Sequence, residues 1–136
     1  MKATGSYSPT KWDEKPYEQI SPTMKLTRAS VELSFKGEIV GEGLVEYLMF
    51  YDYFDQGDPH KSTATYVGLI MFKGQLKGKA GTFVMEDRGS FRQGTATSVL
   101  RMIPESGTGE LKGIGGAGMY SASQEGCRCD LTYELK

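Results

Sequence analysis

Glycines 113, 115 and 118 have the G-x-G-x-x-G spacing with which dinucleotide-binding folds hold a pyrophosphate. That chemistry needs a strand before the motif, a helix that opens on it, and an acidic residue further along the chain. The residues after Gly118, "MYSASQEGCRCDLTYELK", alternate in the manner of a strand and show no helix cap. We therefore predict no nucleotide site and no cofactor.

Glu46, in "LVEYL", is the residue we would assign to acid–base chemistry. A carboxyl group inside an apolar cavity loses hydration, which raises its pKa and suits it to act as a general acid or base near neutrality. Two other interpretations stay open. A one-residue shift in strand register would place Glu46 in solvent, and a buried Glu46 could be a hydrogen-bonded structural carboxylate.

Two other groups of residues have metal-ligand chemistry but lack the spacing for it. Asp52, Asp55, Asp58 and His60 lie in "DYFDQGDPH", which does not match an EF-hand loop and has the composition of turns. The pair in "CRC" has no evident partners for zinc, and residues so close in a strand have poor disulfide geometry. We predict no metal site and two reduced thiols.

The elements that position these residues belong to one domain, residues 1–136, because a chain of this length fits a single core. The formal charge of −1 gives no general attraction to nucleic acid or to an anionic membrane. No stretch approaches the ~20 apolar residues of a membrane-spanning helix. We expect a soluble, cytoplasmic protein with neither kind of partner.

Strand-like alternation predicts an all-β fold. In "KLTRASVELSFK", one face would carry Ala29, Val31, Leu33 and Phe35. The predicted strands are a short one near 3–7, then 25–36, 43–53, 63–73, 79–88, 91–103, 114–121 and 127–135. Eight antiparallel strands with short corners can close into an up-and-down barrel, which we prefer to the alternative of a two-sheet sandwich.

A repeated corner, G-[EQ]-[IL]-x-G, occurs at 37–41, 74–78 and 109–113. We interpret it as a strand–corner–strand unit with all three corners at one rim. Aligning the copies matches Glu46 with Phe83 and predicts that both point inward, with Glu86 on the opposite face. The predicted interior ligand-binding residues are Leu44, Leu48, Tyr66, Ile70, Phe72, Phe83, Met85 and Tyr120.

The outer face of strand 63–73 would carry Val67, Leu69 and Met71, which is unusually apolar for a surface exposed to water. We therefore predict a homo-oligomer, either a dimer or a trimer. Trp12, the single tryptophan, is predicted to lie in a long connection at the rim opposite the glycine corners.

Several segments in order resemble a bacterial family of domains of unknown function with an allene-oxide-cyclase-like barrel of the calycin type. They are "WDEKPY", "KLTRASV", "VEYLMFY", "YVGL", "GTFVMEDRGSF" and "SGTGELKG". The resemblance implies an eight-stranded barrel. In the plant relatives it implies a trimer whose lumen holds an apolar substrate and guides its cyclisation or coupling. It implies no activity for this chain.

Three functions are consistent with these observations, and whether the protein is an enzyme stays open. The first is a barrel that binds a small apolar ligand in its lumen. The second is an enzyme of the cyclase or isomerase type that uses Glu46 as its lumen carboxylate. The third is a structural or interaction oligomer without a ligand.

Overall fold

Strands make up most of the computed structural model, which describes residues 1–136 without a gap. The strands are β1 (Lys2–Gln19), β2 (Lys25–Gly37), β3 (Ile39–Tyr53), β4 (Thr63–Leu76), β5 (Lys79–Arg92), β6 (Thr95–Met102), β7 (Gly115–Ser123) and β8 (Gly126–Glu134). Two short 3-10 turns, η1 (Pro59–Lys61) and η2 (Gly109–Leu111), lie in the connections. Neither turn is long or apolar enough to cross a membrane.

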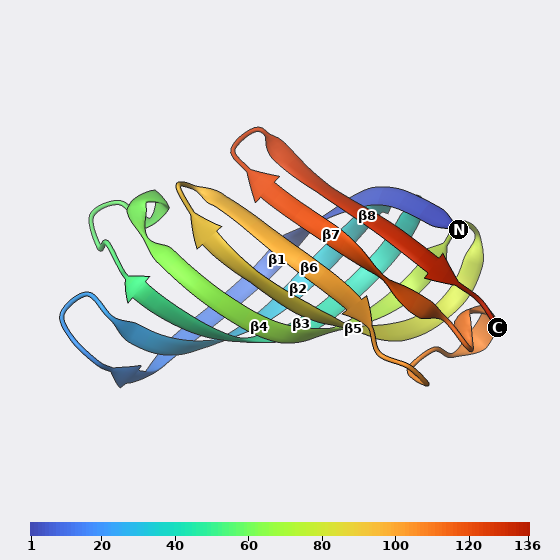
Figure 1. Ribbon diagram of the computed structural model, residues 1–136, viewed down its shortest axis with the longest axis horizontal. Helices are drawn as coiled ribbons and strands as arrows, with labels where there is room; N and C mark the ends of the chain where they lie inside the picture. The colour runs from blue at the N-terminus through green and yellow to red at the C-terminus, as the bar shows by residue number, and fades with distance from the viewer.

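Each strand pairs antiparallel with the next along the chain, and β8 pairs with β1, so that the sheet forms a closed ring (Figure 1). The all-β prediction with eight antiparallel strands is confirmed. The closing pair is short, because β1 pairs with β8 only from Lys2 to Gly5. Beyond Gly5, β1 pairs with β2 alone.

This free side of β1 explains why its sequence looked like a loop. Pairing with β2 is interrupted by a bulge after Pro9 and by another after Pro16. Proline has no backbone N–H to donate, and a strand tolerates this where only one of its sides is hydrogen-bonded to a neighbour. The strand was predicted to end near Tyr7 but continues to Gln19. Trp12 therefore lies in β1 and not in a connection, which corrects the prediction.

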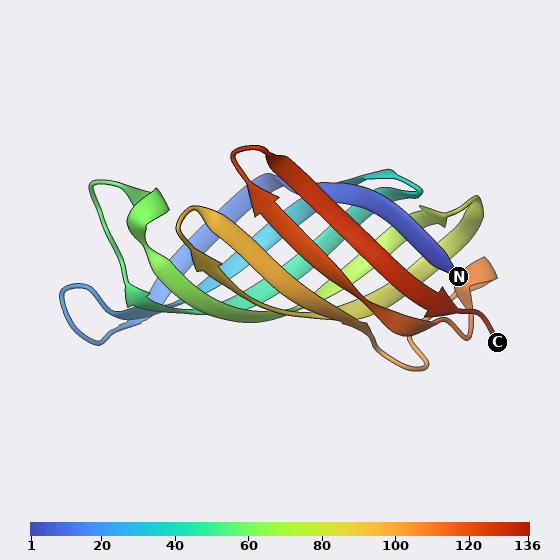
Figure 2. The ribbon, with the colours of Figure 1, turned by 45° about the horizontal axis from the view of Figure 1, so that its top comes forward.

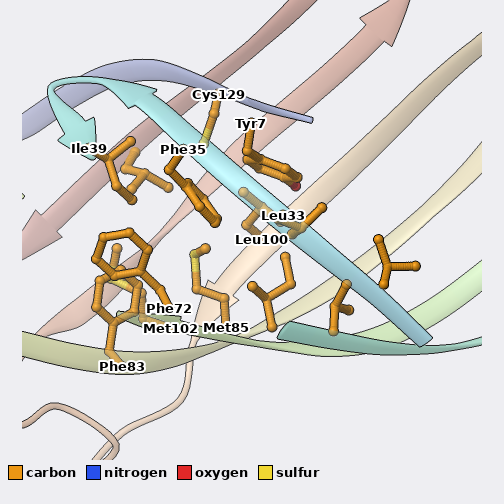
Figure 3. Close-up of a cluster of buried hydrophobic side chains, with 14 of the residues drawn as sticks. Tyr7, Leu33, Phe35, Ile39, Phe72, Phe83, Met85, Leu100, Met102 and Cys129 are labelled. Carbon is orange, nitrogen blue, oxygen red and sulfur yellow. The ribbon is translucent and has the colours of Figure 1, made fainter. Parts of the chain in front are cut away.

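The interior near the chain termini is filled with side chains (Figure 3). Phe35, Phe72 and Phe83 are almost fully buried, and the ring centroids of Phe72 and Phe83 are 5.1 Å apart. Ile70 and Met85 are also fully buried. Burying each large apolar side chain stabilises the fold by about 1.5–3 kcal/mol. This end of the ring is a packed core.

The opposite end carries the long β1–β2 and β3–β4 connections and the β5–β6 and β7–β8 hairpins (Figure 2). The predicted break between strands 79–88 and 91–103 is wrong: residues 89–90 lie within β5, and the chain turns only after Arg92. The unbroken strand carries Asp87 into the interior of the ring.

The three glycine corners lie at the same end, as predicted, but they are not copies of one unit. Lys77 N donates to Glu38 O at 2.8 Å, and Ala80 N donates to Glu110 Oε1 at 3.1 Å. The third copy forms η2 within the long β6–β7 connection and does not join two strands directly. The predicted strand–corner–strand repeat therefore holds for the first two copies only.

The first two corners also differ in register, which reverses the predicted face of β3. Phe35 pairs with Gly41, whereas the equivalent Phe72 pairs with Phe83. If the two corners had the same register, Phe72 would pair with Gly78, the residue equivalent to Gly41. Its actual partner, Phe83, lies an odd number of residues further along the chain. Because side chains alternate between faces, an odd difference turns the matched residues to opposite sides. Glu46 therefore points outward while Phe83 points inward.

Candidate functional site

A cavity of about 330 Å³ occupies the end of the ring that the packed core leaves unfilled. Thirteen of its 17 lining residues are hydrophobic. Its volume is at the lower end of the range typical of small-molecule sites. The lining residues are Tyr7, Pro9, Trp12, Leu33, Tyr47, Met49, Tyr51, Phe54, Pro59, Ser62, Ala64, Tyr66, Asp87, Phe91, Ala96, Tyr120 and Ala122.

Aromatic rings from four strands form much of the wall. Tyr7 on β1 and Tyr120 on β7 stack with their centroids 4.0 Å apart, and the Tyr120 hydroxyl donates to the Tyr7 carbonyl oxygen at 2.8 Å. Tyr47 and Tyr66, on β3 and β4, meet edge to face at 5.3 Å. These contacts hold the rings in fixed orientations, so the cavity is largely preformed.

Asp87 is the one carboxyl group among the lining residues, and only 1% of it is exposed. Its Oδ2 accepts a hydrogen bond from the Tyr47 hydroxyl at 2.7 Å, while its Oδ1 has no partner in the chain. Burial raises the pKa of Asp87, and the nearby hydroxyl groups of Tyr47 and Ser98 offset only part of that rise. No lysine, arginine or histidine lines the cavity to balance its charge.

The phenols around Asp87 stay protonated near neutral pH. Burial raises the pKa of Tyr7, Tyr47 and Tyr120 well above the usual value for tyrosine, and it raises that of Tyr66 to about 12. The Tyr66 hydroxyl shares a hydrogen bond of 2.7 Å with Ser98 Oγ. The buried Tyr7 hydroxyl has no partner. Two polar atoms at this site, Tyr7 Oη and Asp87 Oδ1, therefore lack hydrogen bonds within the chain.

Two glycines allow these polar contacts to form across an intervening strand. Gly68 on β4 is paired with both Tyr47 on β3 and Asp87 on β5. A Cβ at Gly68 would lie 2.6 Å from Tyr47 Cδ1, so only glycine lets the ring lie across β4 toward Asp87. In the same way Tyr66 lies across Gly89, where a Cβ would be 2.6 Å from the Tyr66 hydroxyl and from Ser98 Oγ.

The mouth of the cavity is organised by Glu14. Its carboxylate accepts hydrogen bonds from Trp12 Nε1 at 2.9 Å, Thr27 Oγ1 at 2.6 Å and the Tyr51 hydroxyl at 2.8 Å. The ammonium of Lys25 lies 3.5 Å from the centroid of the Phe54 ring. These contacts fix three aromatic side chains of the mouth without placing a free charge inside it.

The predicted ligand-binding residues divide into three groups. Tyr66 and Tyr120 line the cavity. Ile70, Phe72, Phe83 and Met85 point inward as expected but belong to the packed core, away from the cavity. The prediction that Leu44 and Leu48 lie in the interior is wrong, because both side chains are on the outer face and are 55% and 52% exposed.

Glu46 is also on the outer face, which corrects its predicted role as a lumen carboxylate. It binds Arg28 Nη2 at 2.8 Å and accepts from Ser30 Oγ at 2.9 Å. The hydrogen bonds from Ser30 and Arg28 lower its pKa, which is the reverse of the shift that a general acid needs. Glu86 faces outward too and pairs with Arg88 and Arg101, so the two glutamates do not face opposite sides.

The structure gives the remaining candidate motifs local roles. Asp55 Oδ1 accepts from the backbone nitrogens of Gly57 and Asp58, and Asp58 caps η1 by accepting from His60 N. Gly113 lies in the β6–β7 connection at a φ of 83°, a conformation that favours glycine, and Gly118 packs closely against β8. Cys129 is buried, and burial raises its pKa to about 12.

Sequence reasoning missed Asp87, although the sequence held a signal for it. The alternation that placed Phe83 and Met85 inside continues directly to Asp87. The glycine and serine that follow suggested a turn and hid the continuation of the strand. A carboxyl group in phase with two interior side chains was therefore the signal in the sequence that pointed to this site and was overlooked.

Comparison with known proteins supports the fold and leaves the chemistry open. A crystal structure of a protein of unknown function from the DUF3224 family of Shewanella oneidensis MR-1 superimposes with a TM-score of 0.73 at 23% identity, covering 100% of this chain and 98% of that one. No curated protein matches the sequence. The family model described as "Protein of unknown function (DUF3224)" matches residues 3–135. The chain therefore belongs to the DUF3224 family.

Proposed function

We propose that the protein binds a small, largely apolar molecule in the cavity, with Asp87 as the principal polar contact. The observation that carries the proposal is the combination of a preformed aromatic wall with a buried carboxyl oxygen that has no partner. Buried polar atoms are nearly always hydrogen-bonded, and unpaired ones cost about 1–3 kcal/mol. A ligand that supplies the missing partner recovers that cost.

The proposal is tested with 2-(2-naphthyl)ethanol, a neutral probe with an apolar body and one polar group. Isothermal calorimetry and quenching of Trp12 should both detect it, because Trp12 lines the cavity and is the only tryptophan. Ala96→Phe should abolish binding by filling the cavity. Thr97→Phe adds the same ring to the outer face of β6 and should leave binding intact. Binding that survives Ala96→Phe would contradict the proposal.

A cyclase- or isomerase-type reaction in the same cavity is the second candidate, with Asp87 in the role first given to Glu46. The observation that favours it is a carboxyl of raised pKa held by the Tyr47 phenol at 2.7 Å. If the bound molecule is converted, Asp87→Asn should stop turnover while binding persists. The cyclase-like type of barrel stays a prediction.

We also propose that the outer face of β3 and β4 contacts a second copy of the chain. Leu48 and Val67 are paired on this face and 52% and 40% exposed, and Leu69 beside them is 55% exposed. The charged neighbours already pair within the chain, as in Arg28–Glu46, so the face does not repel its own copy. Sedimentation should find a dimer or trimer at micromolar concentration, and Leu69→Lys should shift it to monomer. A monomeric wild type would contradict this proposal.

A further inference from the structure

The cavity has an uncompensated acidic group at its floor. Asp87 is the only carboxyl group among the residues that line the cavity, and no basic side chain lines it. The chain offers a single hydrogen bond of 2.7 Å from Tyr47 to one carboxyl oxygen and nothing to the other. A buried carboxylate in this state is stabilised by a cation that enters the cavity.

The walls favour an organic cation over a metal ion. Divalent metals need several oxygen or nitrogen ligands, whereas a single carboxyl among aromatic rings gives far fewer. Aromatic faces attract ammonium groups by cation–π interaction. Phe54 already shows this within the chain, since the ammonium of Lys25 lies 3.5 Å from its centroid. Tyr47 and Tyr66 place further rings close to Asp87.

We propose that the cavity selects organic monocations, namely protonated amines carried by a compact apolar or aromatic body, with the nitrogen at the Asp87 end. This inference rests on the proposed ligand-binding function and names its ligand class. The body fills the apolar part of the cavity, and the ammonium donates to Asp87. Anionic ligands of the same shape are rejected, because they would meet the carboxylate without a countercharge.

The test compares three probes that share one body. They are 2-(2-naphthyl)ethylamine, 2-(2-naphthyl)ethanol and 2-naphthylacetate, measured by calorimetry near neutral pH. We expect the amine to bind at least about tenfold tighter than the alcohol, and the acid to bind weakest. Equal binding of amine and alcohol would overturn the inference while leaving the ligand-binding function standing. Failure of all three would count against the function itself.

Asp87→Asn should remove the preference for the amine and leave alcohol binding nearly unchanged, because asparagine keeps the shape and loses the charge. Glu86→Gln is the matched control. It removes a carboxyl one residue away on the outer face, where Glu86 pairs with Arg88 and Arg101, and should leave the preference intact. A preference that survives Asp87→Asn would overturn the inference.

A pH titration of the wild type gives the same answer if Asp87→Asn does not fold. The groups that face Asp87 from neighbouring strands are Tyr7, Tyr47, Tyr66, Tyr120, Cys129 and the Ser98 hydroxyl. All five titratable neighbours stay neutral at and below neutral pH, and the amine probe, with a pKa of about 10, stays charged. The amine preference should therefore disappear as acid protonates Asp87. A preference that is constant down to about pH 4 would overturn the inference.

Discussion

The Tyr47 hydroxyl donates a 2.7 Å hydrogen bond to Asp87 Oδ2 across the full width of β4. The two residues are far apart in sequence, and neither is paired with the other in the sheet. Their contact depends on Gly68, which lies between them. The hydrogen bond therefore joins β3 to β5 at the cavity floor without any backbone pairing between those two strands.

Tyr47→Phe should destabilise the protein by about 1–2 kcal/mol, because it leaves a buried carboxyl oxygen without its donor. It should also raise the pKa of Asp87 further, since the Tyr47 hydrogen bond lowers it. Urea denaturation at neutral pH measures the first effect. Tyr53→Phe is the control, because Tyr53 makes a weaker 3.4 Å bond to Asp55 on the surface and its loss should cost little. Equal costs in the two variants would contradict this account.

The stability of the wild type should fall relative to Asp87→Asn as pH rises above about 4. Folding raises the pKa of Asp87 above its ordinary value of 3.8, so the folded protein keeps a proton that the unfolded chain releases. The stability that this proton contributes is fully present below the unfolded-state pKa of Asp87. It is lost progressively as the pH rises from the unfolded-state pKa to the higher folded-state pKa. Within this window the loss is about 1.4 kcal/mol per pH unit. Parallel stability curves for the two proteins would show that Asp87 does not titrate abnormally.

Gly68→Ala should destabilise the fold by about 1–3 kcal/mol and weaken probe binding. The new Cβ would stand 2.6 Å from Tyr47 Cδ1 and 2.7 Å from the Glu46 carbonyl oxygen, so the Tyr47 ring must move away from Asp87. Thermal unfolding and calorimetry with the naphthyl probes measure the two effects. Gly115→Ala is the matched control, since no atom lies within 4 Å of a Cβ there. A stable Gly68→Ala variant with normal binding would rule out this role for Gly68.

Glu46→Gln should change stability by less than about 1 kcal/mol and leave probe binding unaltered. Its pair with Arg28 is on the outer face, with the two side chains 52% and 66% exposed, where water and salt screen the attraction. Denaturation at low and high salt together with calorimetry checks both expectations. Loss of probe binding in this variant would contradict the expectation, because it would mean that a change on the outer face alters the cavity.

The sequence predicted the fold well because alternation within each strand is a local signal. Tyr66, Gly68, Ile70 and Phe72 follow one another at a period of two, so their shared face can be assigned without knowledge of the rest of the chain. The direction of Glu46 was different, because it depended on where the chain turned. The turn is centred at Glu38 in the first corner and between Lys77 and Gly78 in the second, which changes the register by an odd number of residues although the two corner sequences are similar.

The candidate site could be predicted only in part, because its polar contacts join residues from separate strands. Tyr66 was predicted to be an interior residue, but its hydrogen-bond partner Ser98 lies two strands away across Gly89. Nothing local marks such a pair. The strand glycines 68 and 89 were the available clue, since a glycine inside a strand often marks a close approach by another group.

The short β1–β8 pairing gives the cavity wall one weak side. From Tyr7 onward β1 has no ladder to β8, and the Tyr120 hydroxyl bonded to the Tyr7 carbonyl is the direct link between β1 and β7. Everywhere else, opening the wall would require breaking a row of backbone hydrogen bonds. Along this side the wall is closed by a side-chain hydrogen bond and a ring stack between Tyr7 and Tyr120, so we expect widening it here to cost less free energy than separating any two strands joined by a full ladder.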